Sequence, residues 1–458
     1  MVGDTRAATA FRKLSIALAI GACFGGPALA APGDPLGPAF TLETGAYAFK
    51  RSMTARAGGG GFALAYEEIQ GGKAGIFVRL FDAAGNLLGG TVQVTDAGSS
   101  APYAPVIAMA PGGGFVVAWH DKNNVYARRF SAAGVPTGGA LQVNATTSAQ
   151  VGVPSVAMDP NGDFVVAWSD SLVQNNSYIN IGSCGPYGIC LPIGFRRVRT
   201  GIYSRHYDAS DHPAAQAAIA SGETLTEAEG LVGSGTLSQV LTPTVAMDAD
   251  GDYAIAWLTV NEVGVVFEPS GGDAGAVTAI RLQRFNAQGT PLERPLKVDS
   301  QIRRVGATRL SDEVANPLLA ASASGYELLW LYRHSALRLR QFASRSTSSG
   351  SVATVPQDSG CIVVQPDLAS NAAGDVVVSW DCDLFGTRID AYRYAADGSG
   401  LGPVITVFTS PDANALRTSQ VTAANDAAGN FVLAWNQDAL GTDGNYTGTL
   451  VGRLYTGP

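Results

Sequence analysis

The feature that most constrains the fold is a short aromatic phrase repeated along the chain. All six tryptophans end a five-residue apolar phrase, and a seventh copy ends in tyrosine. The copies are FALAY (62–66), FVVAW (115–119 and 164–168), YAIAW (253–257), YELLW (326–330), VVVSW (376–380) and FVLAW (431–435). Sequence similarity that returns after tens of residues predicts a series of stacked units rather than one irregular domain.

Each aromatic phrase belongs to a longer unit. An apolar run and a turn precede it, as in PSVAMDPNGD (154–163), and a second phrase ending in an aromatic follows, as in ARRF (127–130). A glycine-containing turn and a closing run complete the unit. Runs of about five residues rich in Val, Phe, Tyr and Trp predict strands. Four-stranded units in series predict a β-propeller, because stacking in a ring buries both faces of every unit and explains strands that are apolar throughout.

The two ends of the chain hold complementary parts of one unit. The last unit stops at GRLYTGP (452–458), after its third strand, while GDPLGPAFTLE (33–43) resembles the closing run of a unit. We therefore expect residues 35–42 to pair with residues 450–455 and to remove an exposed sheet edge. The prediction is an all-β, seven-bladed propeller of four-stranded antiparallel blades, with residues 31–458 in one domain.

These units resemble a repeat family of exported bacterial proteins that carry tandem VAMDxxGDFVVAW…GIYARRFDAxG patterns. The resemblance covers nearly all of residues 33–458. It is close in the second, third and fourth units and looser in the fifth, which reads VANPLLAASASGYELLW (314–330). It implies a propeller and an exported location, and it implies no established activity.

The first thirty residues have the pattern of a secretory signal peptide. Arg12 and Lys13 precede the apolar run LSIALAIGACF, and the segment ends in Ala28-Leu29-Ala30. A second interpretation is a lipoprotein signal, in which Cys23 would be lipidated. No other segment is apolar for long enough to span a membrane. We expect a protein that is secreted, periplasmic or held at the cell surface.

The net charge excludes some classes of binding partner, and the cysteine content predicts disulfides. The net charge is −8, and residues 1–30 contribute +2, so residues 31–458 carry −10. An acidic chain without a basic stripe is a poor ligand for nucleic acid or anionic membranes. Four cysteines follow the signal, and an even number in an oxidising compartment predicts the disulfides Cys184–Cys190 and Cys361–Cys382. The second pair flanks a turn predicted near residues 371–374 and is expected to staple two paired strands.

The first cysteine pair lies in an insertion, residues 169–200, after the third aromatic phrase. It would close a small loop with Tyr187 near its tip. One interpretation is a preformed recognition finger, and the other is a decoration that packs over the third blade. Arg196 and Arg197 follow, and they could recognise an anion or simply be solvated.

Polar residues follow the aromatic phrases and should ring the face that carries the longer loops. Such residues could bind a cation or a polyol, or act as acid and base, although solvent favours polar residues at strand ends in any case. They are Glu67, Glu68, His120, Asp121, Ser169, Asp170, Tyr332, Arg333, His334, Asp381, Asp383, Asn436, Gln437 and Asp438.

Two turns on the opposite face carry oxygen ligands at alternate positions, as calcium loops do. Their residues are Asp159, Asn161, Asp163, Asp248, Asp250 and Asp252. Equivalent turns such as MAPGGG (109–114) have none of these acids, and a tight turn ending in glycine explains every copy. Calcium is the one cofactor that the sequence suggests.

An arginine recurs two residues before the aromatic of the second phrase. It is present in five units, as Arg79, Arg128, Arg205, Arg340 and Arg453. We interpret it as a structural group that pairs or stacks within its own blade.

Three functions are consistent with these observations. The first is a monomeric, non-enzymatic binding module for an extracellular glycan or protein. The second is a carbohydrate-active hydrolase or lyase, and the third is a structural module of the cell envelope. No H-E-x-x-H, G-x-S-x-G or S-x-D-x-G-x-x-W motif is present, which favours binding over catalysis. Two carboxylates brought together by folding would leave no local signature.

Overall fold

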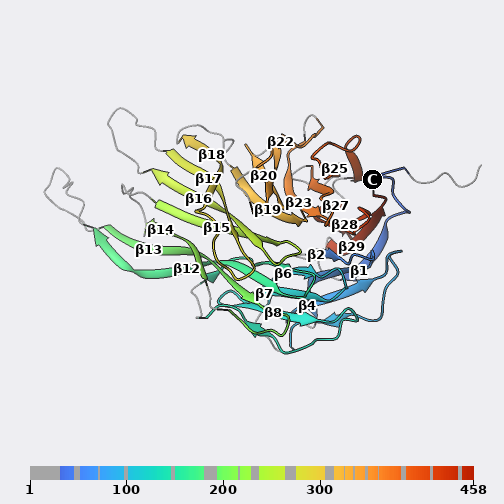
Figure 1. The fold of residues 1–458 in the computed structure, drawn as a ribbon, viewed down its shortest axis with the longest axis horizontal. Coiled ribbons are helices and arrows are strands. Elements are labelled where there is room, and N and C mark those ends of the chain that lie inside the picture. The colour runs from blue at the N-terminus through green and yellow to red at the C-terminus, as the bar shows by residue number, and fades with distance from the viewer. Residues whose placement is uncertain are drawn as a thin grey trace, which may run out of the picture.

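The computed structural model describes residues 31–45, 52–70, 73–96, 102–145, 150–179, 193–214, 217–227, 237–263, 275–304, 314–323, 325–333, 336–345, 349–358, 361–382, 388–412, 416–441 and 446–457. In these ranges the chain forms strands and no helix, so none of the described segments is a helix that could cross a membrane. The strands form seven antiparallel blades around a channel, which confirms the predicted propeller (Figure 1). Blades 1 to 7 are numbered along the chain.

Every blade has an innermost, a second, a third and an outermost strand. The innermost strands are β2 (Ser52–Arg56), β6 (Tyr103–Met109), β10 (Gln150–Val151) with β11 (Ser155–Met158), β15 (Leu237–Met247), β19 (Val314–Ser322), β23 (Val364–Ser370) and β27 (Leu416–Asn425). The second strands are β3 (Phe62–Gln70), β7 (Phe115–His120), β12 (Phe164–Ile179), β16 (Tyr253–Val263), β20 (Gly325–Tyr332), β24 (Val376–Asp381) and β28 (Phe431–Leu440).

The third strands are β4 (Lys73–Phe81), β8 (Val125–Phe130), β13 (Ile193–Tyr207), β17 (Gly275–Phe285), β21 (Ala336–Ala343), β25 (Arg388–Tyr394) and β29 (Tyr446–Tyr455). The outermost strands are β5 (Val92–Gln93), β9 (Leu141–Gln142), β14 (Ala217–Glu227), β18 (Leu296–Arg304), β22 (Ala353–Thr354), β26 (Ile405–Thr409) and β1 (Phe40–Gly45).

The ring closes through the two ends of the chain, as predicted. Strand β1 is the outermost strand of blade 7, where it pairs with β29 from Phe40↔Gly452 to Gly45↔Gly448, and Figure 1 shows the two side by side. The preceding turn continues the pairing, because Thr456 N donates to Asp34 O at 3.0 Å and Gly33 N donates to Thr456 O at 3.1 Å. Gly33 has a φ of 88°, and a Cβ there would lie 2.5 Å from the Arg393 guanidinium, so glycine is required.

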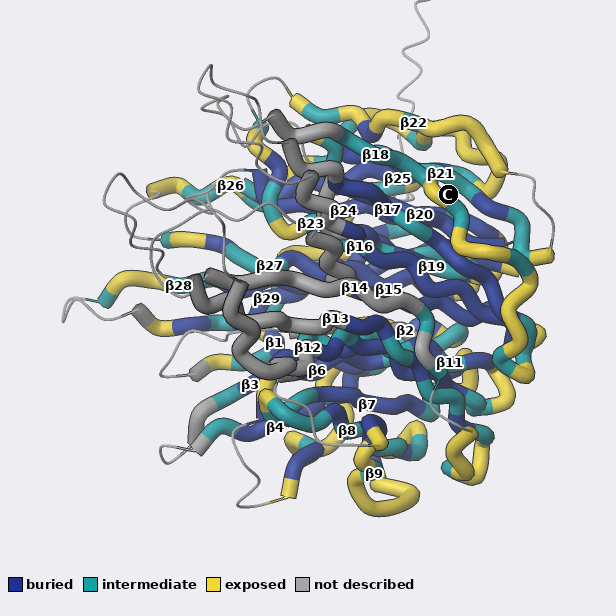
Figure 2. The backbone as a smooth tube through the Cα atoms, turned by 90° about the vertical axis from the view of Figure 1, so that its left-hand side faces the viewer, coloured by how far each residue is buried: buried dark blue, intermediate teal, exposed yellow. Residues whose placement is uncertain are grey.

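The core lies between blades rather than inside one sheet. The described residues form seven apolar clusters, and each joins two neighbouring blades. Side chains of a second strand alternate between the two neighbours: Phe62 and Leu64 face blade 7, whereas Ala63 faces blade 2. Both faces are therefore buried along the aromatic phrases, and the middle of the ring is dark in Figure 2.

The two repeated phrases meet within each blade. The first residue of the aromatic phrase stacks on the last aromatic of the second phrase in five blades, with ring centroids 4.7–5.0 Å apart. The pairs are Phe62–Phe81, Phe115–Phe130, Phe164–Tyr207, Tyr253–Phe285 and Phe431–Tyr455. The spacing of the phrases thus sets the register between the second and third strands.

The insertion at residues 169–200 differs from the loop that the sequence suggested. Residues 169–179 continue β12 and residues 193–200 belong to β13, and the two remain paired as far as Ile179↔Ile193. Strand β14 pairs with β13 along the same extension, and one pair, Glu223↔Ser238, joins β14 to β15. In the described parts of the insertion, residues 169–179 and 193–200, the backbone is paired as sheet apart from a bulge between Gln174 and Asn176. Blades 3 and 4 consequently form one sheet that extends from the ring (Figure 1).

Candidate ligand-binding site in the central channel

A bulge recurs in the innermost strands. In blade 6 the pairing jumps from Val364↔Asp381 to Asp367↔Ser379, so that two residues of β23 lie opposite one of β24. Blades 2, 4, 5 and 7 show the same shift, and in blade 3 it separates β10 from β11. The first bulge residue has a positive φ in four blades, at Ala104, Thr242, Gln365 and Gln420.

Proline fits this bulge for a physical reason. It has no N–H, so it costs no ladder hydrogen bond where pairing is already interrupted. Pro105, Pro154, Pro243 and Pro366 each stand fourteen residues before the tryptophan of their blade, and Pro317 stands thirteen before Trp330. This spacing was the signal in the sequence that could have located the channel lining.

The bulges surround a cavity of about 690 Å³ on the channel axis. Its lining comes from blades 2 to 7 and alternates apolar residues with neutral polar ones, and it includes Thr242, Thr244, Gln365, Asp367 and Gln420. The lining residues stand near the middle of the innermost strands. We call the face with the blade-to-blade connections and the extended hairpins the mouth face; the other is the turn face.

A repeated hydrogen bond joins the innermost strands of neighbouring blades at the cavity wall. Ser155 Oγ of blade 3 accepts from Val245 N at 3.0 Å, and Thr244 Oγ1 of blade 4 accepts from Leu319 N at 3.1 Å. Asp367 Oδ2 of blade 6 accepts from Ala423 N at 2.7 Å. The three side chains occupy one position of the repeat, opposite the residue that precedes the tryptophan.

The acids that follow the aromatic phrases lie behind this wall. Glu67 is 4% exposed, and its Oε2 accepts from Ala104 N at 3.3 Å. Asp381 is 1% exposed, and its Oδ2 accepts from Gln420 N at 3.1 Å. Each carboxylate thus binds the bulge of the next blade. These two acids, predicted as ligand contacts, hold the residues that shape the cavity, and Asp170 is also buried.

Three other predicted residues lie at the mouth face. His120 is half-buried beside the ring of Tyr103, with centroids 6.0 Å apart. Asp121 accepts from the N–H groups of Asn123 and Asn124 and from the hydroxyl of Tyr126. The ring of Tyr332 lies under the guanidinium of Arg338 at 3.3 Å. None of them lines the described part of the cavity wall.

Several predicted residues cannot be placed. Tyr187, Cys184, Cys190, His334 and Asp383 lie outside the described residues, as do the signal segment and Cys23. Arg196 and Arg197 are placed by backbone only, in β13, opposite Asn176 and Gln174. Their suggested roles stay predictions.

The acids of the two predicted calcium turns bond mostly within their own turns. Asp159 Oδ1 accepts from Asp163 N at 2.8 Å, and Asp248 Oδ1 accepts from the N–H groups of Asp250 and Asp252. Asp252 Oδ2 also accepts from Arg345 Nε at 2.6 Å. Burial raises the pKa of Asp248. Among the described residues no three acids of these turns come together as ligands, and calcium binding remains a prediction.

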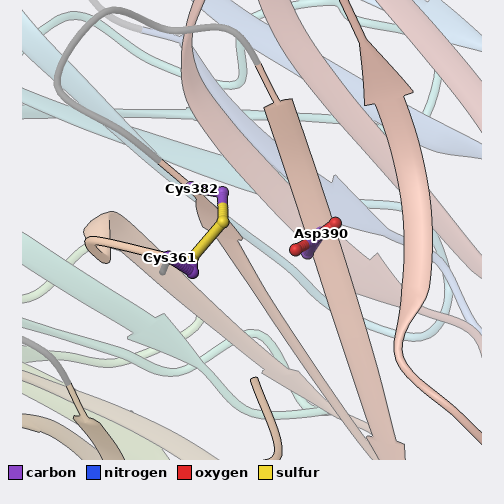
Figure 3. A group of neighbouring side chains, drawn as sticks. All are labelled: Cys361, Cys382 and Asp390. Carbon is purple, nitrogen blue, oxygen red and sulfur yellow. A yellow bond between two sulfur atoms is a disulfide. The ribbon is translucent and has the colours of Figure 1, made fainter. Parts of the chain in front are cut away.

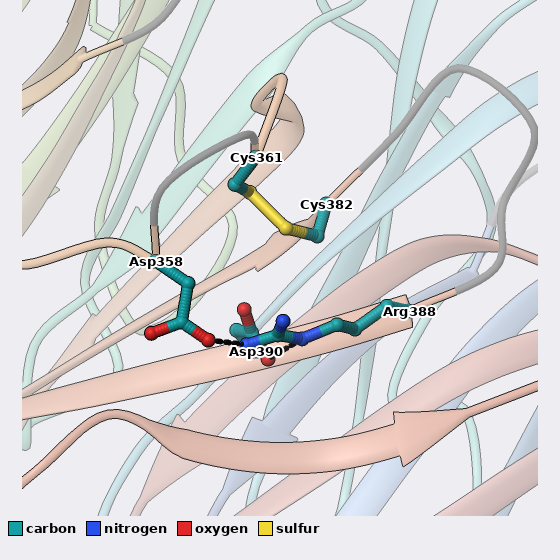
Figure 4. Close-up of a disulfide and its surroundings, with 5 residues drawn as sticks. All are labelled: Asp358, Cys361, Cys382, Arg388 and Asp390. Carbon is teal, nitrogen blue, oxygen red and sulfur yellow. Dashed lines mark hydrogen bonds and ion pairs between the residues drawn. A yellow bond between two sulfur atoms is a disulfide. The ribbon is translucent and has the colours of Figure 1, made fainter.

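The predicted Cys361–Cys382 disulfide is confirmed, and it lies on the mouth face of blade 6 beside Asp390 (Figure 3). Both sulfurs and one Asp390 oxygen lie within 4.8 Å of one another, but the disulfide leaves no thiolate to bind a metal. Arg388 contacts both Asp358 and Asp390, with Nε to Asp390 Oδ1 at 2.8 Å (Figure 4). Burial raises the pKa of Asp390, which has no exposed surface.

The repeated arginine bonds both within its own blade, as expected, and to the neighbouring blade: Arg128 lies over the ring of Phe130 and donates from Nε to Gly138 O at 3.1 Å within blade 2. Arg128 Nη1 donates to Val94 O of blade 1, Arg453 Nη1 donates to Val407 O of blade 6, and Arg79 pairs with Glu43 of β1. In blade 5, Arg340 keeps to its own blade, where it bonds Gly350 O and lies over the ring of Phe342. Outermost strands leave carbonyl groups unpaired, and the next blade brings these donors to them.

Comparisons with known proteins give the fold only. No family model matches the chain, and no curated protein matches it. A protein of unknown function from Dyadobacter fermentans DSM 18053 is 10% identical, covers 78% of this chain and 95% of its own, and has a TM-score of 0.43. An α-L-arabinanase from Penicillium chrysogenum, complexed with arabinobiose, is 9% identical over 91% and 98%, with a TM-score of 0.41. The polysaccharide lyase Uly1 is 8% identical over 91% of each chain, with a TM-score of 0.45.

Proposed function

We propose that the protein is an exported, non-enzymatic binding module that takes an oligosaccharide in the mouth of its central channel. The observation that carries the proposal is the cavity of about 690 Å³ with contributions from six blades. A volume of roughly 300–1,000 Å³ is typical of sites for small ligands. The Cys361–Cys382 disulfide supports export, since such bonds persist in oxidising compartments.

The chemistry of the wall suits a polyol. Hydroxyl and amide groups of Ser155, Thr244 and Gln365 can exchange hydrogen bonds with sugar hydroxyls, while Pro243 and Leu318 offer apolar surface to C–H faces. At the rim, Tyr103 is 36% exposed and provides an aromatic face. The arrangement therefore supplies both kinds of surface that a sugar ring presents.

Backbone strain at the same place supports a binding role. Thr242, Gln365 and Gln420 line the cavity with positive φ values of 46°, 46° and 55°. Such conformations cost of order 1 kcal/mol or more for a residue with a side chain, and they cluster at ligand sites. The strained bulge residues therefore recur in several blades and surround one cavity.

The test is an array of neutral, amino and acidic oligosaccharides probed with the labelled full chain. Thr242→Trp places an indole in the cavity mouth and should reduce every specific signal at least about tenfold, equivalent to 1.4 kcal/mol. Thr290→Trp, on an exposed turn of the opposite face, is the matched control and should change nothing. Absence of binding, or equal binding by both variants, would remove the proposal. Shortening of a bound oligosaccharide on incubation would replace it with the hydrolase or lyase hypothesis.

A further inference from the structure

Residues Ala31-Pro32-Gly33-Asp34 form a tight turn just before the closing strand of the ring. Asp34 N donates to Ala31 O at 2.9 Å, and Gly33 has a φ of 88°. Proline in the second position and glycine in the third are favoured in a type II turn, because the third residue needs a positive φ. The Asp34 side chain folds back across the turn, and its Oδ2 accepts from Ala31 N at 2.7 Å. The local sequence therefore places the Ala31 nitrogen beside a carboxylate.

Residues far along the chain hold this turn in place. Thr456 Oγ1 donates to Ala31 O at 2.6 Å, and Thr456 N donates to Asp34 O at 3.0 Å. Arg393 Nη2 of blade 6 donates to Pro32 O at 2.8 Å, and the same guanidinium attracts Asp34 electrostatically. These bonds join residues at least 361 positions apart in the sequence. The turn is therefore part of the closure of the ring.

Removal of the predicted signal would change the charge of the Ala31 nitrogen. Hydrolysis of the Ala30–Ala31 bond, after the Ala28-Leu29-Ala30 site, consumes one water and leaves a carboxylate on Ala30. Ala31 then carries a primary amine, which is protonated at neutral pH. A lipoprotein signal, cut before Cys23, would instead leave Ala31 N as an uncharged amide. The two kinds of processing therefore differ in whether Asp34 meets a cation at this atom.

We propose that the Ala30–Ala31 bond is the processing site of the exported chain, and that Asp34 binds the ammonium group which cleavage produces and so locks the ring. Before cleavage the turn offers Asp34 only an uncharged N–H. Cleavage replaces it with an ion pair at the junction of the two ends of the chain. The lock rests on the export that the proposed function includes, and it acts whether or not the cavity holds a saccharide.

The first test identifies the amino terminus of the processed protein. The full chain is exported from a bacterial host, and the intact mass of the product is measured. We expect the mass of residues 31–458 with an unmodified amino group. A lipidated Cys23, an uncleaved chain or a first residue other than Ala31 would overturn the inference. Saccharide binding is measured separately on the array, so its failure is distinguishable from a failure of processing.

The second test asks whether the charge of the amino group tightens the closure. Hydrogen exchange followed by mass spectrometry compares residues 31–458, which include every described residue, with the same chain preceded by Ala28-Leu29-Ala30. The longer chain keeps an N–H donor at Ala31 and moves the charge three residues away. At about pH 6.5 and about 50 mM salt, the Thr456 N–H should exchange about threefold more slowly in the shorter chain, as expected for an exposed ion pair. The Gly251 N–H, which donates to Asp248 O in blade 4, is the matched control and should exchange equally in both chains.

Two further changes separate the charge from the contact. The threefold ratio should shrink toward one in about 1 M salt, because salt screens an exposed pair. Asp34→Asn keeps an acceptor oxygen for Ala31 N and removes the negative charge, so the two chain lengths should then exchange alike. Equal exchange of the unchanged chains at low salt, or a ratio that survives in Asp34→Asn, would overturn the lock.

Discussion

Aspartate side chains have different hydrogen-bond partners at the two ends of the central channel. At the turn face, Asp426 Oδ1 accepts from Ala428 N and Asn430 N, both at 2.9 Å, and so closes its own turn. At the mouth face, Asp381 accepts from Gln420 N, 39 residues away and in the next blade. In this pair the turn-face carboxylate of Asp426 fixes local geometry, whereas the mouth-face carboxylate of Asp381 fixes how two blades meet.

Glu327 departs from this rule at the turn face. Equivalent positions in the other six blades are apolar and buried: Ala63, Val116, Val165, Ala254, Val377 and Val432. Glu327 is 2% exposed, faces blade 6 and accepts from Ser322 Oγ at 3.0 Å. Burial raises its pKa to about 7, and the Ser322 hydroxyl only partly opposes the shift.

The largest expected effect comes from the mouth face, where the disulfide spans 21 residues of blade 6. Replacing Cys361 and Cys382 together by Ser should lower the free energy of unfolding by about 3 kcal/mol or slightly more, because the unfolded chain gains freedom. Urea unfolding measures the loss. A reductant should destabilise the original protein by more than the double variant, and a loss under about 1 kcal/mol would contradict the structural role.

The second prediction concerns the pH dependence of stability that follows from the raised pKa of Glu327. Its pKa is about 7 in the folded chain against 4.5 for the free side chain, so the folded state holds the proton more tightly. Stability should therefore fall by up to about 3 kcal/mol as pH rises from 4.5 to 7. Urea unfolding across this range should show that slope, and Glu327→Gln should lack its contribution. Identical slopes in both proteins would contradict the buried, proton-retaining carboxyl.

The third effect tests whether mouth-face acids position the cavity. Asp381→Ala removes one of the two acceptors of Gln420 N, the other being Gln365 Oε1 at 2.7 Å, and should cost about 1.5 kcal/mol of unfolding free energy. The same variant should weaken saccharide binding, because the bulge at Gln420 loses a fixed position. Calorimetric binding together with urea unfolding checks both. Reduced stability with unchanged affinity would show that Asp381 supports the ring alone.

The smallest effect is the matched change at the turn face. Asp426→Ala removes three hydrogen bonds, from Ala428 N, Asn430 N and Asn430 Nδ2, at a half-exposed turn and should cost about 1 kcal/mol. Saccharide affinity should remain within error, because the change is local and lies at the opposite end of the channel. If Asp426→Ala altered affinity as much as Asp381→Ala, the contrast between the two faces would be wrong.

Much of the fold was predictable because each blade repeats the same local information. The stacked pair Phe431–Tyr455 joins two phrases that are visible in the sequence, and the pairing of β1 with β29 followed from a missing fourth strand. The disulfide was predictable because its cysteines flank one hairpin. The course of residues 169–200 was not, since this segment lacks the repeated phrases and its described parts pair both with each other and with β14.

The candidate site was harder to predict than the fold. Glu67 and Asp381 stand where the sequence suggested a ring of ligand contacts, yet both are buried against the next blade. Thr242 and Gln365 line the cavity, and nothing in their residue type indicates a bulge. The position of the bulge is indicated in the sequence by the proline that follows each of them. This proline stands fourteen residues before the tryptophan of its blade.

The sequence by itself determined the number of blades, their strand order and the closure of the ring, because spacing and apolar runs depend on neighbours along the chain. Tertiary structure alone decided which polar side chains meet at the channel, because those hydrogen bonds cross from one blade to the next. Asp367 shows the difference: its residue type is visible in the sequence, and its hydrogen bond to Ala423 N, at the position where Ser155 and Thr244 bond other blades, emerges only in the folded ring.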